Sequence, residues 1–267
     1  MHSVLQNLYN RRDKKVPVND GRKIVLVLFG GTMNGVRSAG IMIALKELGL
    51  THAFDQIYAL SAGVPNACGL LSEQTQMSAS ILYEDLIGKE FMNLTRLWMV
   101  IDTGFAVDVF EKKKRLDVVK LKQARTDLMI GLYNLTQREC QYKRMQDFSE
   151  SEMFSVIRAA TSIPYLTPGS INLRGEQYMD FPFRNYLYNL HIQTALESKA
   201  TDVLIIFNYH DQVTLTMKLS QHALLIQPQP QWDLSRFEQD PEKLKSACIQ
   251  MGTYFKSMFG VDEPIKL

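Results

Sequence analysis

The chain has 267 residues, of which 46% are hydrophobic and 22% charged, and its formal net charge is +2. This length fits one α/β domain, or at most two, with a sizeable buried core. The balanced charge argues against a nucleic-acid partner bound through bulk positive charge. The three cysteines, Cys68, Cys140 and Cys248, are widely spaced and form no C-x-x-C pair, so a reduced, cytoplasmic setting without disulfides or a zinc site is expected.

The N-terminal segment, residues 1–20, is predicted to form an arm, and residues 21–267 a single domain. The arm contains several basic side chains but no apolar run of the kind that a secretory signal requires. No later segment approaches the roughly 18 uninterrupted apolar residues of a membrane span. We therefore expect neither a signal peptide nor a transmembrane segment, while peripheral contact with a membrane stays open.

Two successive strand-turn-helix patterns lie within residues 23–71. Residues 23–29 form an apolar run typical of a strand buried on both faces of a parallel sheet, and a glycine-bearing loop at 30–35 separates it from an amphipathic helix. Residues 54–60 then predict a second strand, followed by a tight turn and a helix over 64–72.

The second turn contains the sequence Ala59-Leu60-Ser61-Ala62-Gly63. This is a small-x-Ser-x-Gly nucleophile elbow, in which small neighbours let strand and helix approach and the serine projects above the sheet. Ala59 replaces the usual first glycine and would be strained only if its φ were positive. A serine before a helix is more often simply an N-cap.

The glycine loop at 30–35 is also a weak signal when taken alone, because such loops can bind phosphate at a helix N-terminus. Neither the P-loop pattern nor the dinucleotide-binding fingerprint fits its spacing. The two turns together are more informative, because acyl transfer needs a nucleophile and nearby backbone N–H donors for the developing oxyanion.

The middle of the chain is rich in large apolar and basic side chains. Residues 77–110 show a helical pattern through Phe91, Leu94, Trp98 and Ile101, which favours core packing, with an apolar lid or acyl-chain pocket as the alternative. Residues 111–125 hold seven basic and two acidic residues. We interpret them as a solvated helix face, the alternative being a docking face for anionic lipid head groups.

The remaining segments predict further strands and helices. A strand is expected at 127–135, a polar segment at 136–150, and a helix at 151–160 that a capping box of Ser149 and Glu152 begins. The helix ends in Ala-Thr-Ser-Ile-Pro at 160–164, and a hairpin then leads to Asp180 at the end of a strand. The chain is completed by strands at 202–207 and 224–230 and by a helix after Asp240. We interpret the strand at 224–230 and this helix as scaffold and as a candidate wall of a pocket.

These features, in this order, resemble the patatin-like phospholipase family. That family has a glycine-rich loop after its first strand, a G-x-S-x-G elbow, a helix that ends in a Ser/Thr-x-x-Pro segment, and an aspartate in an Asp-Gly or Asp-Ala pair. The counterparts here are residues 30–35, 59–63, 160–164 and Asp180, and the correspondence spans residues 23–210. It implies a three-layer α/β/α domain with a mostly parallel central sheet.

Besides Ala59, the chain departs from the family pattern at three further positions. The family loop reads Gly-Gly-Gly-x-Arg/Lys-Gly, whereas Thr32 stands at the third glycine place and Asn34 at the basic one, with Arg37 three residues further on. Phe181 follows Asp180 in place of glycine or alanine. The departures leave the serine and the aspartate intact.

The resemblance implies a lipid acyl hydrolase of the phospholipase A or lysophospholipase type, which uses a Ser-Asp dyad and needs no cofactor. Ser61 would be the nucleophile and Asp180 its base, with a phospholipid or other acyl lipid as substrate. Backbone N–H groups from Gly30, Gly31, Thr32 and Ala62 would bind the oxyanion. The supporting positions are Asn34, Gly35, Arg37 and Gly63.

Two alternatives remain at this point. One is a Ser-His-Asp esterase in which His210, just beyond the strand at 202–207, works with Ser61 and either Asp180 or Asp202. The other is a catalytically impaired relative that binds lipids or proteins, which the altered loop and Phe181 would favour. The other histidines show no metal-ligand spacing.

Overall fold

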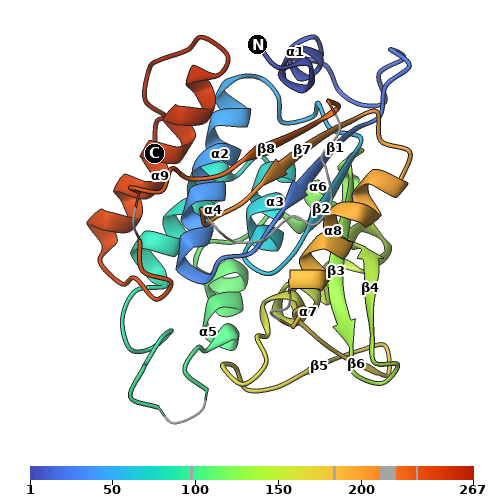
Figure 1. Ribbon diagram of the computed structural model, residues 1–267. Helices are drawn as coiled ribbons and strands as arrows, with labels where there is room; N and C mark the ends of the chain where they lie inside the picture. Colours follow the sequence, from blue (N-terminus) through green and yellow to red (C-terminus); the bar gives the residue numbers. More distant parts are fainter. Residues whose placement is uncertain (97–98, 183–184, 211–220, 233) are drawn as a thin grey trace.

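The computed structural model of the protein describes residues 1–96, 99–182, 185–210, 221–232 and 234–267 (Figure 1). Within these residues, the strands are β1 (Ile24–Leu28), β2 (Gln56–Ala59), β3 (Asp127–Asn134), β4 (Glu139–Arg144), β5 (Ile171–Leu173), β6 (Glu176–Met179), β7 (Asp202–Ile206) and β8 (Ala223–Ile226). The α-helices are α1 (Ser3–Tyr9), α2 (Gly35–Glu47), α3 (Gly63–Leu71), α4 (Thr75–Ser80), α5 (Thr103–Asp108), α6 (Val118–Gln123), α7 (Glu150–Thr161), α8 (Asn185–Glu197) and α9 (Pro241–Ser257). Short 3₁₀ turns form η1 (Thr32–Asn34) and η4 (Met145–Asp147), and π-helical turns form η2 (Ile81–Asp85) and η3 (Val109–Lys113).

All the described strands belong to a single sheet in the order β5-β6-β3-β2-β1-β7-β8, with β4 beside β3. The central strands β3, β2, β1, β7 and β8 run parallel to their neighbours, while β4, β5 and β6 pair antiparallel at one side. The mostly parallel sheet predicted from the sequence is thus confirmed. Its parallel strands bring their carboxyl ends to one edge, where ligands of open α/β sheets bind.

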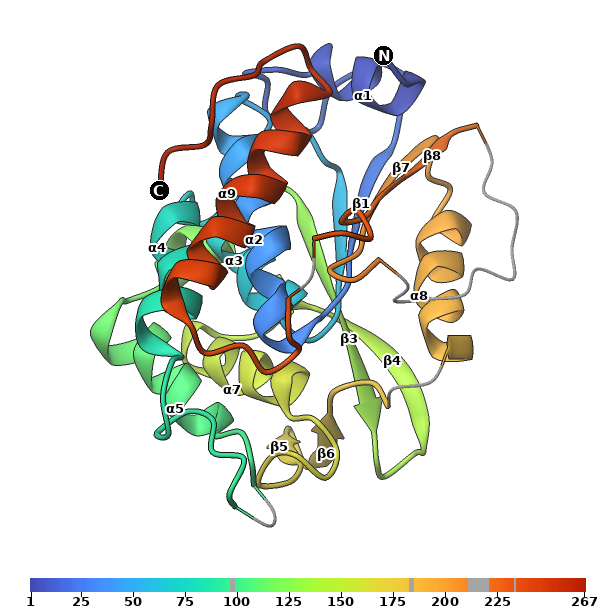
Figure 2. The ribbon, with the colours of Figure 1, turned by 60° about the vertical axis from the view of Figure 1, so that its left-hand side comes forward.

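Helices cover both faces of this sheet, and the three-layer α/β/α prediction is also confirmed. Successive residues of β1 point to opposite faces, so Leu26 belongs to a large core with α2, α3, α7 and α9, and Val25 and Val27 belong to a smaller one. The smaller core includes Leu187 and Ile192 of α8. Figure 2 shows α2 and α9 on one side of the strands and α8 on the other.

The segment at 1–20 contains α1 and packs onto the rest of the chain. Val4 and Leu8 of α1 are fully buried in the larger core. Arg11 is also fully buried, and its guanidinium pairs with Asp20 at 2.8 Å and with Asp55 at 2.7 Å. A buried guanidinium needs such partners, since an unpaired charge in this position would be costly. No helix among the described residues is long and apolar enough to cross a membrane.

The helix predicted for residues 77–110 is wrong over part of its length. Helical structure covers 75–85 and resumes at Thr103, but the residues between run as a loop in which Met92 and Ile101 form an isolated antiparallel bridge. Gly88 has a φ of +92°, a conformation that a helix does not contain. Trp98 lies outside the described residues.

Besides α1, which lies in the predicted arm, two elements were not predicted. Strand β4 lies in the segment taken as polar, because its cross-strand partners on β3 support it in spite of half-exposed side chains. Helix α8 has little segregation of apolar and polar faces, so its sequence gives a weak periodic signal.

The basic run at 111–125 is not one helix, since η3 ends at Lys113 and α6 begins at Val118. Lys113 and Lys114 each lie 2.7 Å from the buried carboxylate of Asp85. These lysines thus stabilise a buried charge on the neighbouring turn η2. Lipid docking by this run stays untested.

Candidate active site

Ser61 lies in a tight turn between β2 and α3, at the carboxyl edge of the sheet. Its φ is +49°, the left-handed conformation that a nucleophile elbow imposes on its serine. The turn is closed by hydrogen bonds from the Gly63 N–H to the Leu60 oxygen (2.8 Å) and from the Val64 N–H to the Ser61 oxygen (2.9 Å). Ala59 belongs to β2 and has no positive φ, so its replacement of glycine introduces no backbone strain.

Asp180 reaches Ser61 because β6 extends the path of β2 beyond its end. Both strands pair with β3, β2 through Ala59 opposite Ile130 and β6 through Met179 opposite Tyr133. Strand β2 is parallel to β3, so continuing its register by two residues places Ser61 two positions beyond Ile130. Strand β6 is antiparallel to β3, so continuing its register by one residue places Asp180 one position before Tyr133. Both residues thus fall opposite the same position of β3. Both side chains line one polar cavity.

The Asp180 carboxyl is buried, at 2% exposure, and its two oxygens differ. Oδ1 accepts the backbone N–H of Phe181 at 2.8 Å. Oδ2 accepts no hydrogen bond from the described part of the chain, although it is buried. Burial raises the pKa of Asp180 to about 7, against the smaller lowering effects of the Ser61 hydroxyl and the Phe181 N–H. Such a group can take up and release a proton near neutral pH.

Phe181, the departure from the family's Asp-Gly or Asp-Ala pair, is buried in the smaller core and also lines the cavity that contains Asp180. It packs edge-on against Tyr142 at 5.9 Å between ring centroids. Gly131 makes room for it, because a Cβ there would lie 3.2 Å from the Phe181 ring and 2.3 Å from Leu60. The phenylalanine is therefore compatible with an aspartate directed toward Ser61.

The glycine loop after β1 crosses directly beside Ser61. A Cβ at Gly30 would lie 2.3 Å from the Ser61 Cβ and 2.9 Å from its Oγ, so the close approach requires glycine. Asn208, fully buried after β7, holds this loop by donating from Nδ2 to the Phe29 oxygen (2.7 Å) and the Gly30 oxygen (3.1 Å). These two hydrogen bonds hold the loop against the residues that follow β7.

The expected oxyanion donors lie around the serine. Gly31 and Thr32 line the polar cavity, Ala62 lines the adjoining apolar one, and Thr32 and Ser61 line both. In the described residues, the backbone N–H groups of Gly31, Thr32 and Ala62 donate to no protein acceptor. Thr32 has a φ of +51°, which explains why glycine is usual at this place in the family pattern.

The positions proposed as supporting have structural contacts behind the loop. Arg37 is buried and donates to the Asn34 Oδ1 (2.6 Å), to the Asn208 oxygen (2.8 Å) and to the Trp232 oxygen. It lines neither cavity. The Gly35 carbonyl accepts Nδ2 of Asn66 at 2.8 Å, which joins α2 to α3 beneath the site.

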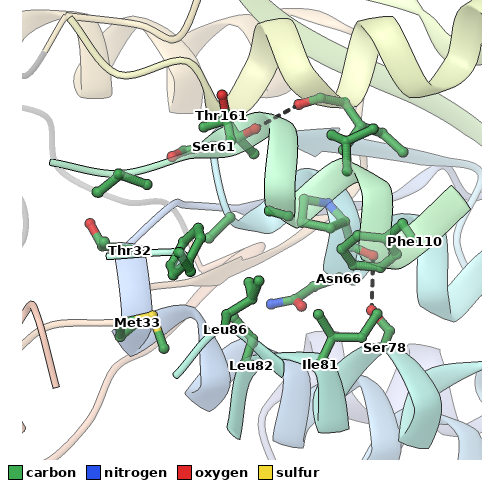
Figure 3. A pocket seen from close by; sticks show the side chains of 18 of the residues that line it. Thr32, Met33, Ser61, Asn66, Ser78, Ile81, Leu82, Leu86, Phe110 and Thr161 are labelled. Atoms are coloured by element: carbon green, nitrogen blue, oxygen red, sulfur yellow. Dashed lines mark hydrogen bonds between the residues drawn. The ribbon is translucent and has the colours of Figure 1, made fainter. Parts of the chain in front are cut away.

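An apolar cavity opens on the other side of Ser61. It encloses about 660 Å³ of empty space, a figure that includes the open solvent at its mouth. Figure 3 shows Ile81, Leu82 and Leu86 across this cavity from Ser61. Phe91 and Ile101 also line it, so the segment interpreted mainly as core packing contributes to the pocket that was its alternative.

The residues of the alternative triad are not brought together. Asp202 begins β7 at the amino edge of the sheet, and its carboxylate binds Asn7 at 2.7 Å and Arg22 at 3.2 Å. His210 is exposed, and it is not among the described residues that line the two cavities beside Ser61. The geometry therefore favours Asp180 alone as the partner of Ser61.

The sequence interpretation missed several residues of this site. Asn208 supports the glycine loop, and Tyr188, Tyr209 and Arg236 line the polar cavity. Asn208 and Tyr209 follow a buried strand directly, at the edge where ligands bind in α/β folds, which is a usable signal. Nothing in the local sequence of Arg236 points to the site, because the tertiary fold alone brings it there.

Comparisons with known proteins support the fold. The scan against protein-family models gave no match, and the search of curated proteins found no significant match. Among solved structures, VipD from Legionella pneumophila is similar, with a TM-score of 0.52 and 10% sequence identity. The alignment covers 89% of this chain and 67% of VipD. The likeness supports the patatin-like fold that the sequence predicts and, at this identity, concerns the fold alone.

Proposed function

We propose that this protein hydrolyses acyl esters of phospholipids or related lipids through a Ser61–Asp180 dyad. The observation that carries the proposal is the meeting of three features at one point. The first is a serine in a strained elbow, and the second is a buried carboxylate whose Oδ2 accepts no hydrogen bond among the described residues. The third is a glycine loop whose N–H groups at Gly31 and Thr32 donate to no acceptor among the described residues. Acyl transfer needs each of them.

The first half-reaction transfers the acyl group to the serine. Asp180 Oδ2 takes the Ser61 proton as Oγ attacks the ester carbonyl carbon, and the carbonyl oxygen becomes an oxyanion. The N–H groups of Gly31, Thr32 and Ala62 bind this oxyanion, and losing one such donor costs about 3 kcal/mol of transition-state stabilisation. The oxyanion then collapses, the bond to the leaving oxygen breaks, and Asp180 gives its proton to that oxygen.

The second half-reaction repeats these roles with water as the nucleophile. Asp180 takes a proton from the water as it attacks the acyl-Ser61 ester, and returns it to Ser61 Oγ when the fatty acid leaves. The apolar cavity beside Ser61 suits the acyl chain, since its lining is mainly aliphatic and aromatic.

The proposal is tested by fatty-acid release from mixed phospholipid vesicles and from p-nitrophenyl butyrate. We expect Ser61→Ala to lower kcat/KM by about 1,000-fold or more, and Asp180→Asn to have a comparable effect, because the two act as a unit. Ser78→Ala is the matched control, as this buried serine lines the apolar cavity but lacks a carboxylate partner.

A fluorophosphonate probe separates the proposal from a non-catalytic binding protein. Labelling requires an activated serine but little substrate fit, so wild type is expected to react and Ser61→Ala to remain unlabelled. A folded wild-type protein that neither hydrolyses these esters nor takes up the probe would contradict the proposal and favour a lipid-binding module.

A further inference from the structure

Ser61 lies between two cavities that differ in their polar and charged lining residues. The apolar cavity is lined mainly by aliphatic and aromatic residues of α5, α7, η2 and η3, whereas the polar cavity is lined by the glycine loop, Asp180, two tyrosines, Arg236 and two apolar residues. Ser61 and Thr32 line both. An ester bound at Ser61 can therefore direct its acyl part and its alcohol part into different surroundings.

The position of Asp180 decides which part enters which cavity. In the proposed mechanism, the carboxyl that takes the Ser61 proton must give it to the leaving oxygen, so that oxygen has to lie within hydrogen-bond reach of Asp180. Asp180 lines the polar cavity and not the apolar one. The alcohol part of the substrate thus departs through the polar cavity, and the acyl chain occupies the apolar one.

The polar cavity contains a positioned positive charge. The Arg236 guanidinium lies over the Tyr209 ring, 4.9 Å from its centroid. Tyr209 is itself anchored, because its hydroxyl donates to the Gly31 oxygen at 2.5 Å. The main chain is tied there too, since the Arg236 carbonyl accepts the Met33 N–H at 3.4 Å. The guanidinium is thereby held beside the oxyanion loop.

A guanidinium favours a particular chemistry in the alcohol part. Its planar fork matches the oxygens of a phosphate, and charge-assisted hydrogen bonds of this kind are among the strongest in proteins. The polar cavity also contains the Asp180 carboxyl, which would repel an anion that no cation offsets. Arg37 cannot take this role, because it lines neither cavity beside Ser61.

We propose that Arg236 selects acyl esters whose leaving alcohol carries a phosphate, by binding that phosphate in the polar cavity. The inference rests on the proposed function and adds the residue that recognises the phosphate of the leaving alcohol. It makes Arg236 a binding residue for the leaving group, with no part in proton transfer.

The test compares two substrates with the same acyl chain in neutral detergent micelles, oleoyl lysophosphatidate and monooleoylglycerol, which differ only in the phosphate. We expect Arg236→Gln to lower kcat/KM for the lysophosphatidate by about 10- to 100-fold, mainly through KM, and for monooleoylglycerol by less than about 3-fold. Arg236→Lys should retain part of the selectivity, since it keeps the charge but not the fork.

Arg12→Gln is the matched control. This exposed arginine also lies over a tyrosine ring, that of Tyr9 at 5.9 Å, but next to α1 at the opposite end of the sheet (Figure 1). Its substitution is expected to leave both rates unchanged. A second readout is inhibition of p-nitrophenyl butyrate hydrolysis by glycerol 3-phosphate, which should weaken in Arg236→Gln by a similar factor.

The outcomes separate the two proposals. Wild-type inactivity on every ester contradicts the proposed function and this inference with it. If wild type hydrolyses both lipids and Arg236→Gln leaves the selectivity unchanged, the inference alone is overturned. Equal losses on both substrates in Arg236→Gln overturn it as well. A loss confined to the phosphate-bearing lipid and partly restored in Arg236→Lys supports it.

Discussion

Gly30 lies so close to Ser61 that the two residues leave no room for a side chain between them, since a Cβ on Gly30 would be 2.3 Å from the Cβ of Ser61. Such a contact would force the loop or the elbow to move. Gly30→Ala should therefore lower kcat/KM by about 100-fold or more, because displaced N–H donors no longer meet the oxyanion. Ester hydrolysis and the rate of fluorophosphonate labelling measure the effect.

Gly175→Ala is a control for this substitution. Gly175 has a φ of +92° and open space around it, so alanine there costs about 1–2 kcal/mol of backbone strain without touching the serine. We expect lower stability but near-normal activity. Equal activity losses in both variants would mean that the Gly30 effect is only general destabilisation.

Thr32 is a β-branched residue in a left-handed backbone conformation, with a φ of +51°. This conformation costs an L-residue about 1–2 kcal/mol. A Thr32→Gly variant is relieved of that strain, but the gain is partly offset because glycine has more conformational freedom to lose from the unfolded chain. Thr32→Gly should raise the free energy of unfolding by about 0.5–1 kcal/mol and keep the activity. Urea unfolding measures the gain. Thr32→Ala keeps a Cβ and hence most of the strain, so an equal gain in both variants would contradict this explanation.

The sequence could predict the central part of the fold because its signals there are local. The runs that became β1 and β7 are fully buried on both faces, and such strands read as continuous apolar segments. The capping box predicted at Ser149 and Glu152 is present at the start of α7. Asp240 likewise caps α9, whose first residue is Pro241.

The remaining features depend on tertiary contacts that no local pattern contains. The loop at 86–102 has helical apolar spacing, yet Phe91 and Ile101 are buried by lining a cavity rather than by a helix face. The polar cavity combines a hairpin, the end of β7 and Arg236, which lie far apart in sequence. The dyad itself could be predicted from order and resemblance, whereas the register on β3 that brings it together could not.

Stability should depend on pH through Asp180. Its pKa rises from an unfolded value of 3.8 to about 7 in the fold because the carboxyl is buried. Between pH 3.8 and about 7, the folded chain thus binds more protons than the unfolded chain. The effect of Asp180 on the free energy of unfolding is therefore absent below about pH 4 and becomes increasingly destabilising as the pH rises to 7. Asp180→Asn cannot ionise and escapes this effect. It should be more stable than wild type at pH 8 by a few kcal/mol, with little difference at pH 4.

Urea unfolding of both proteins at pH 4, 6 and 8 measures this dependence. Asp147→Asn serves as control, since that carboxyl is 60% exposed and lies outside the site. A stability difference between wild type and Asp180→Asn that does not change with pH would contradict the raised pKa.

Activity should depend on pH in the opposite sense. The proposed base works only when ionised, so kcat/KM for an uncharged ester should rise about tenfold per pH unit below about 7 and level off above it. Hydrolysis of p-nitrophenyl butyrate between pH 5 and 9, quenched at a fixed pH before reading, gives the profile. The residual rate of Asp180→Asn should lack this inflection. A wild-type profile that is flat from pH 5 to 8 would rule out Asp180 as the base.

The apolar cavity should set the length of the acyl chain. Leu82 lies across it from Ser61 (Figure 3), so Leu82→Trp fills the space that a long chain would occupy without reaching the serine. We expect kcat/KM for p-nitrophenyl palmitate to fall at least about tenfold, and that for the acetate to change by less than about 3-fold, because the short chain leaves this space empty. The cost of overpacking in stability is about 1–3 kcal/mol.

Leu94→Trp is the matched control, since Leu94 is 62% exposed and lies outside the lining of the cavity. It should leave both esters unaffected. If Leu82→Trp lowers both rates equally, the substitution has disturbed the elbow and not the chain site. If it lowers neither, the acyl chain occupies another surface, and the assignment of the apolar cavity to the chain fails. A selective loss on the palmitate supports it, because among the variants discussed only this one narrows the cavity at a distance from the reacting atoms.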